Sequence, residues 1–102
     1  MKQIGQQEFS TAISQWIVVV DFFATRCGPC KMIAPYLNEM SEKLAGKVSF
    51  YKVDVDQEQG IAAQQGIRAM PTMKVFKDGK EVQTVVWADL KALWQWLQSI
   101  IK

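Results

Sequence analysis

The sequence has no histidine and only two cysteines among its 102 residues. Histidine is the side chain that ordinarily titrates near neutral pH, so proton transfer at pH 7 requires a cysteine or a carboxyl group with a shifted pKa. Two cysteines are too few for a disulfide-rich secreted scaffold, and a domain of this size does not need one. Without histidine they also do not complete a zinc site within the chain, because such sites normally have four ligands.

Long apolar runs and blocks of like charge are also missing. The longest apolar stretch, residues 16–24, is interrupted by Asp21 and is much shorter than the roughly 20 residues that cross a bilayer. The net charge is only +2, with lysines and acidic residues interspersed, so we expect neither nucleic acid nor a membrane as a partner. Residues 1–8 lack the apolar segment of a signal peptide, which predicts a cytoplasmic or similarly reducing location.

The length and an apolar content of 49% predict one domain over residues 1–102, and the order of apolar patterns predicts an α/β fold. Buried strands are expected at residues 17–23 and 48–55, and a hairpin is expected to join strands 73–76 and 81–86 through Asp78-Gly79. Strand–helix–strand connections require parallel pairing, whereas the final hairpin requires an antiparallel pair. The prediction is therefore a mixed central sheet with helices on both faces.

Four helices are expected around this sheet. The first begins near Glu8, and its buried side consists of Phe9, Ala12, Ile13 and Trp16. The second follows a turn at residues 25–29, is kinked by Pro35 and ends at Gly46. A short third helix is expected at residues 58–64. The buried side of the last helix consists of Leu90, Leu93, Trp94, Leu97, Ile100 and Ile101.

The segment Cys27-Gly28-Pro29-Cys30 follows a predicted buried strand and opens the second helix. Cys27 is then at a helix N-terminus, where unpaired N–H groups and the helix dipole lower the pKa of a thiol and activate it. Cys30 is one turn later, within disulfide reach, and can resolve a mixed disulfide formed at Cys27. A structural cysteine pair, half of a zinc site and chance spacing are the alternatives, and the strand–turn–helix context favours redox chemistry.

Motifs along nearly the whole chain resemble the thioredoxin family, most of all its eukaryotic cytosolic and fungal members. They are VVVDFFAT at 18–25, CGPCKMIAP at 27–35, YKVDVD at 51–56, IRAMPT at 67–72 and FKDGK at 76–80. The resemblance implies the thioredoxin fold and a protein dithiol–disulfide oxidoreductase, with Cys27 as nucleophile and Cys30 as resolving cysteine. It also implies a redox-active disulfide between these two cysteines.

The same resemblance implies how such a protein is supplied with electrons. It implies no bound cofactor and no metal, and a flavoprotein thioredoxin reductase that draws on NADPH to restore the dithiol. Its substrates would be disulfide-containing proteins such as peroxiredoxins and reductases. A monomer is expected, with a dimer through the active-site face as the alternative.

The resemblance also assigns roles to residues outside the cysteine motif. Met70-Pro71 matches the family's cis-proline loop, which offers backbone hydrogen bonds to an extended substrate, although the sequence alone equally allows Pro71 to start a strand. Asp21 matches a buried acid behind the second cysteine, and Lys52 matches the lysine beside that acid. Burial would raise the pKa of Asp21 and suit it to exchange a proton with Cys30, whereas a plain Asp21–Lys52 ion pair is the structural alternative.

Two residues depart from the family pattern. Arg26 stands where the family has a tryptophan, and Trp87 stands where it has a groove glycine. We expect Trp87 to lie near Arg26 and Met70-Pro71, where the guanidinium can stack on the indole. Together with Gly28 and Pro29, these residues form the predicted substrate-binding surface.

The departures leave two alternative functions open. An altered groove suits a thioredoxin-like binding module with weak redox activity. Alternatively, two Cys27–Cys30 pairs supply the four thiolates that a [2Fe–2S] cluster needs, which would give an iron–sulfur-bridged dimer.

Overall fold

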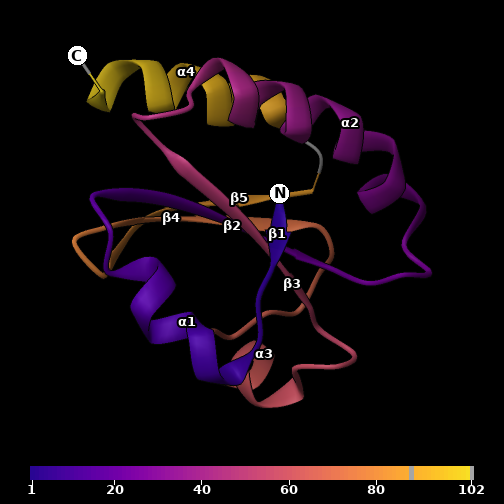
Figure 1. Ribbon diagram of the computed structural model, residues 1–102. Helices are drawn as coiled ribbons and strands as arrows, with labels where there is room; N and C mark the ends of the chain where they lie inside the picture. Colours follow the sequence, from indigo (N-terminus) through magenta and orange to yellow (C-terminus); the bar gives the residue numbers. More distant parts are fainter. Residues whose placement is uncertain (88, 102) are drawn as a thin grey trace.

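A five-stranded mixed sheet lies between two layers of helices in the computed structural model, which describes residues 1–87 and 89–101 (Figure 1). Ala88, which follows Trp87, and Lys102, the last residue of the predicted domain, are outside the described residues. The strands are β1 (Lys2–Gln3), β2 (Ile17–Phe23), β3 (Ser49–Asp54), β4 (Thr72–Lys77) and β5 (Lys80–Val86). The helices are α1 (Gln6–Ile13), α2 (Gly28–Lys43), α3 (Gln59–Gln64) and α4 (Leu90–Ile100).

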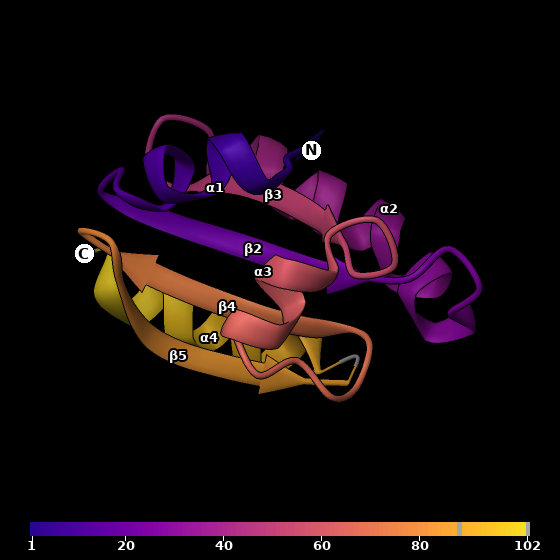
Figure 2. The same cartoon turned by 90° about the horizontal axis from the view of Figure 1, so that it is seen from below.

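The strand order is β1-β3-β2-β4-β5, with parallel pairing among β1, β3 and β2 and antiparallel pairing of β4 with β2 and β5. The predicted mixed sheet is therefore confirmed. Helices α2 and α4 cover one face, and α1 and α3 cover the other, as Figure 2 shows from below.

The central strand β2 is buried on both faces, and its side chains alternate between two cores. Ile17 and Val19 pack in the core under α2 and α4, whereas Val18 and Val20 pack in the core over α1 and α3. Asp21 is two residues after Val19 and is therefore on the same face of β2, so its carboxyl group points toward α2. The alternation of β2 thus places one acidic side chain beneath the helix that carries the cysteines.

The predicted hairpin is confirmed at residues 77–80. Asp78 and Gly79 have φ angles of 54° and 84°, the two positive values that a two-residue type I′ turn requires. Asp-Gly is the residue pair that adopts these angles readily, which is why the sequence signal was strong.

The first helix differs from the prediction at both ends. The Glu58 carboxylate accepts the backbone N–H of Gln6 at 2.9 Å, so the helix starts two residues before Glu8. It ends at Ile13, because the chain has to extend to enter β2 at Ile17. Phe9 and Ala12 are buried as predicted.

The prediction that Trp16 belongs to the buried side of this helix is wrong. Trp16 is beyond the helix and 56% exposed, and the Lys77 Nζ lies 4.6 Å from its ring centroid. Helix α2 continues through Pro35 as far as Lys43, and Gly46 follows it with a φ of 84°.

Candidate active site

The two cysteines meet at the junction of β2 and α2. After β2 ends at Phe23, a short turn leads to Cys27, the N-cap residue of α2. The backbone N–H of Cys27 donates to the Ala24 carbonyl at 3.1 Å, which fixes this turn. Cys27 and Cys30 form a disulfide with their Cα atoms 5.2 Å apart. The pairing expected from the spacing and the family resemblance is therefore present.

The two sulfur atoms have different surroundings. Cys30 is only 4% exposed, whereas Cys27 is partly exposed at the helix end. The backbone N–H of Cys30 donates to Cys27 Sγ at 3.1 Å. When the disulfide is reduced, this donor and the helix N-terminus favour a thiolate at Cys27. An incoming disulfide therefore has access to the sulfur that the backbone is arranged to keep negatively charged.

Gly28 and Pro29 form the exposed first turn of α2, and proline suits this turn because its missing N–H needs no partner there. The Met70–Pro71 peptide bond is cis. Because Thr72 pairs with Phe22, Pro71 is at the end of the sheet from which the turn to Cys27 departs. The segments that carry Cys27 and Pro71 thus come together at one end of the sheet.

Trp87 directly follows β5 and lies beside the proline, since its backbone N–H donates to the Pro71 carbonyl at 2.9 Å. Its φ of 64° is in the left-handed region that glycine adopts without strain. Trp87 as a whole is 63% exposed. The tryptophan therefore keeps a backbone conformation typical of glycine and presents a large ring to solvent.

The expected stacking of Arg26 on this ring is not found. The cation–π pairs within the described residues are Lys52 over Phe23 and Lys77 over Trp16. The Arg26 side chain is exposed. A solvated guanidinium gains little from an exposed stacking contact, because water already satisfies its charge.

Asp21 is 3% exposed, and its Oδ1 has no hydrogen-bond partner. Burial raises the pKa of this carboxyl from its ordinary value of 3.8 to about 7, and the positive charge of Lys52 opposes that rise. A carboxyl with this pKa is close to half-protonated at neutral pH. Such a carboxyl is able to accept or release a proton near pH 7, in a chain that has no histidine.

Lys52 is next to Asp21 in the β2–β3 register, but the two side chains do not form an ion pair. The salt bridges in the described part of the chain join other residues: Lys2 to Glu8, Lys43 to Glu39, and Lys74 to Glu81. The Lys52 Nζ instead lies 5.5 Å from the centroid of the Phe23 ring. The plain Asp21–Lys52 ion pair, the structural alternative for these residues, is therefore absent.

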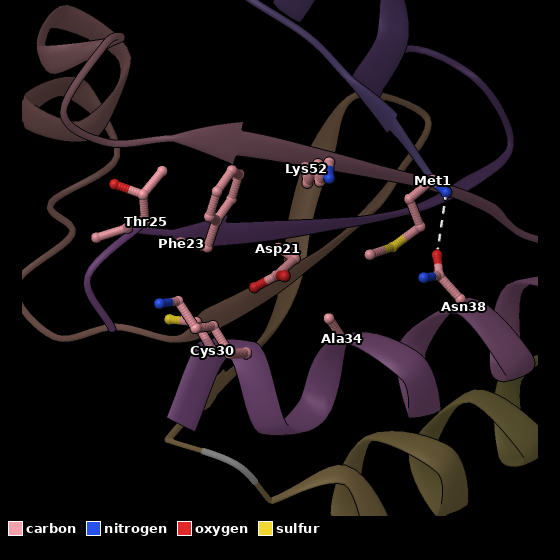
Figure 3. A pocket seen from close by; sticks show the side chains of 10 residues that line it. Met1, Asp21, Phe23, Thr25, Cys30, Ala34, Asn38 and Lys52 are labelled. Atoms are coloured by element: carbon pink, nitrogen blue, oxygen red, sulfur yellow. Dashed lines mark hydrogen bonds between the residues drawn. The ribbon is translucent and has the colours of Figure 1, made fainter. Parts of the chain in front are cut away.

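A cavity of about 310 Å³ connects Asp21 with Cys30 (Figure 3). Figure 3 shows Asp21 reaching from β2 toward Cys30 on α2. The cavity is lined by Met1, Asp21, Phe23, Ala24, Thr25, Cys30, Lys31, Ala34, Asn38 and Lys52. Its size and its polar groups allow it to hold several water molecules. Of the two cysteines, Cys30 lines the cavity and Cys27 does not.

No group of three or more histidine, cysteine, aspartate or glutamate side chains suited to a metal ion occurs within the described residues. The helices of this same part of the chain also include none that is long and apolar enough to cross a membrane.

Comparison with known proteins shows what this arrangement belongs to. The sequence model of the thioredoxin family matches residues 1–99. The chain belongs to the thioredoxin family. A thioredoxin of Malassezia sympodialis is 58% identical over 74 residues, which cover 72% of this chain and 70% of the relative.

Solved thioredoxin structures show the same fold. Plasmodium falciparum thioredoxin has a TM-score of 0.91 and 43% identity, with 98% of this chain and 99% of that chain covered. A second chain also has a TM-score of 0.91, with 33% identity over 98% of this chain and 95% of the other. It comes from a study of thiol resolution in yeast mitochondrial 1-Cys peroxiredoxin by the glutathione and thioredoxin systems. As a thioredoxin with a redox-active cysteine pair, the chain is a protein dithiol–disulfide oxidoreductase.

The sequence did not predict several of the residues that line the Asp21 cavity, the cavity of about 310 Å³ described above. Asn38 and Met1 are the main ones. A signal for Asn38 was present, since Cys30, Ala34 and Asn38 are four residues apart and line one side of α2. The small Ala34 in the middle of this row leaves room for the cavity. Met1 had no such signal, because its position depends on the pairing of the two-residue strand β1 with β3.

Proposed function

We propose that Cys27 is the nucleophile and Cys30 the resolving cysteine, within a single thioredoxin domain formed by the whole chain. The observation that carries this assignment is the contrast between a partly exposed Cys27 at the N-cap and a buried Cys30 beside the Asp21 cavity. The Cys27 thiolate attacks one sulfur of a substrate disulfide, forms a mixed disulfide and expels the other substrate sulfur as a thiolate.

Asp21 acts as the base in the second step of this proposal. Its carboxylate takes the proton from the Cys30 thiol across the cavity, directly or through water. The Cys30 thiolate then attacks Cys27 Sγ, forms the Cys27–Cys30 disulfide and releases the second substrate sulfur as a thiolate. Asp21 passes its proton to water, so one dithiol has been oxidised and one disulfide reduced. Lys52 keeps the carboxyl ionisable despite its burial.

The proposal includes a thioredoxin reductase that uses NADPH to restore the dithiol, in a reducing compartment such as the cytoplasm, with the protein acting as a monomer. Thiol–disulfide exchange itself needs no bound cofactor. Disulfide-containing proteins, peroxiredoxins among them, are the proposed substrates. The similar chain solved in the study of peroxiredoxin thiol resolution by the glutathione and thioredoxin systems supports that substrate class.

Reductase-coupled turnover of a model disulfide protein tests this function. We expect NADPH consumption that depends on the reductase, on the disulfide substrate and on this protein together. The alternatives give other results, because a binding module would bind the substrate without turnover and an iron–sulfur dimer would absorb visible light when freshly purified. Membership of the thioredoxin family favours neither alternative.

Replacing Trp87 tests its role in the proposed substrate groove, which is the surface formed by Arg26, Gly28, Pro29, Met70-Pro71 and Trp87. Trp87→Gly should raise turnover of bulky protein disulfides severalfold and leave the rate with glutathione disulfide nearly unchanged, because only a bulky partner meets the exposed indole beside Pro71. It should also stabilise the fold by about 1 kcal/mol, since a side chain at positive φ is strained. Turnover assays and urea unfolding measure the two effects.

Trp87→Ala is the matched control, because it removes the ring but keeps a Cβ at the strained position. It should reproduce the gain in turnover and give a smaller gain in stability than glycine. Equal rate changes with the large and the small disulfide would contradict a role of Trp87 in partner selection.

A further inference from the structure

At the end of the Asp21 cavity away from Cys30, two segments of the chain come into contact. The nitrogen of Met1 donates to Asn38 Oδ1 at 3.1 Å, and both residues line the cavity (Figure 3). Met1 directly precedes β1, and Asn38 is on α2. Asn38 is also exposed, so the same side chain borders both the cavity and the surrounding water.

This end of the cavity is well separated from the proposed substrate groove. Asn38 is eight residues after Cys30, which is about 12 Å along the helix. Cys27, Pro71 and Trp87, the residues that would meet a substrate, do not line the cavity. The Met1–Asn38 contact is therefore separate from the residues proposed to meet a substrate.

We propose that Met1 and Asn38 form the outer gate of a proton route that leads from Asp21 to water on the side away from the bound substrate. The proposal rests on the proposed function, in which the Asp21 carboxylate takes the Cys30 proton. That transfer occurs while the substrate is still attached to Cys27, so the proton needs an exit that the substrate does not block. Met1 and Asn38 are positioning residues in this scheme, since they touch neither sulfur nor substrate.

The groups around Asp21 make its ionisation sensitive to this gate. Lys52 faces it from β3, Cys30 and Lys31 face the cavity from α2, and the backbone nitrogen of Met1 lies at the gate. Met73, which pairs with Asp21 from β4, is neutral. Because burial is the main cause of the raised pKa of Asp21, a change in how much water the gate admits should move that pKa.

Two substitutions at Asn38 should have opposite effects. Asn38→Leu replaces a polar gate residue by an apolar one, so less water enters and the pKa of Asp21 rises. Asn38→Ala shortens the gate residue, so more water enters and the pKa of Asp21 falls. At pH 6, a change of about half a pH unit in the pKa of Asp21 alters the fraction of carboxylate about threefold. We therefore expect the resolving step at pH 6 to be about threefold slower in Asn38→Leu and about threefold faster in Asn38→Ala.

Tyr36→Leu is the matched control, because Tyr36 is on the same helix, is 61% exposed and does not line this cavity. The pKa of Asp21 is read directly by a ¹³C NMR titration of its carboxyl in the oxidised protein, and the resolving rate is measured in single-turnover reactions from pH 5.5 to 8. Opposite pKa shifts in the two Asn38 variants, absent from Tyr36→Leu, support the gate.

An unchanged Asp21 titration in both Asn38 variants would overturn the gate, whatever the activity of the protein. The pKa of Asp21 could also move in opposite directions in the two Asn38 variants without any change in the resolving rate. The gate would then still control the ionisation of Asp21, but the proton route would be overturned. That second result would also remove Asp21 from the proposed catalytic step, so the two failures are distinguishable.

Discussion

Cys30→Ser should accumulate a covalent mixed disulfide with its substrate, whereas Cys27→Ser should lose disulfide reduction almost completely. Cys27 is partly exposed, and its Sγ already accepts a backbone N–H at the helix N-terminus, so it still attacks when Cys30 is replaced. No second thiol then remains to break the Cys27–substrate bond. In Cys27→Ser the remaining sulfur is 4% exposed and a substrate cannot reach it. We expect turnover to fall by at least about a thousandfold.

Non-reducing electrophoresis and intact-mass spectrometry detect the trapped species, and reductase-coupled turnover gives the loss of activity. The double variant Cys27→Ser/Cys30→Ser is the control and should capture no substrate. Capture by Cys27→Ser but not by Cys30→Ser would mean that the roles of the two cysteines are reversed.

The features that the sequence predicted well are those set by neighbouring residues. The Cys27–Cys30 pair depends on a two-residue spacing at a strand-to-helix junction, and the Asp78-Gly79 turn depends on two residues that tolerate positive φ. Strand β2 was recognisable because both of its faces are buried and nearly all its residues are apolar. The one polar residue in that strand, Asp21, was for the same reason a visible candidate.

The features that the sequence did not predict depend on packing between distant segments. The cavity exists because Ala34 is small and because Met1 is brought to α2 by the pairing of β1 with β3. Trp16 matched a helical period, but the chain leaves the helix three residues earlier. The side chains of Arg26 and Trp87 are both exposed, and nothing in the local sequence determines whether two solvated side chains meet.

Replacing Asp21 should change both the stability of the fold and its dependence on pH. The pKa of this carboxyl is raised from 3.8 to about 7 by burial, so the folded state binds the proton more tightly than the unfolded chain does. Stability contributed by this group is therefore present below about pH 4 and is lost as pH rises toward 7. Above pH 7 the buried carboxylate costs up to about 4 kcal/mol, from a difference of about three pH units.

Asp21→Asn removes this ionisation but leaves a buried amide with unsatisfied hydrogen-bonding groups, which costs about 1–3 kcal/mol. At pH 8 the variant should therefore be more stable than the wild-type protein by about 1–3 kcal/mol, the difference between the two effects. At pH 4 the wild-type carboxyl is already protonated in the folded state, so the gain should disappear or change sign. Urea unfolding at pH 4, 6 and 8 measures the difference, and the exposed Asp56→Asn should show no such trend.

The same substitution should slow the resolving step, because asparagine cannot take the Cys30 proton. The loss should be largest near pH 8, where the wild-type carboxyl is mostly ionised and able to act as a base, and smallest near pH 5.5, where it is mostly protonated. Stability and rate should thus move in opposite directions at pH 8, since the ionised carboxylate destabilises the fold at the pH where it serves the reaction. A pH-independent stability difference would mean that Asp21 does not titrate with a raised pKa in the folded protein. If Asp21→Asn resolved the mixed disulfide at the wild-type rate from pH 6 to 8, Cys30 would lose its proton by another path.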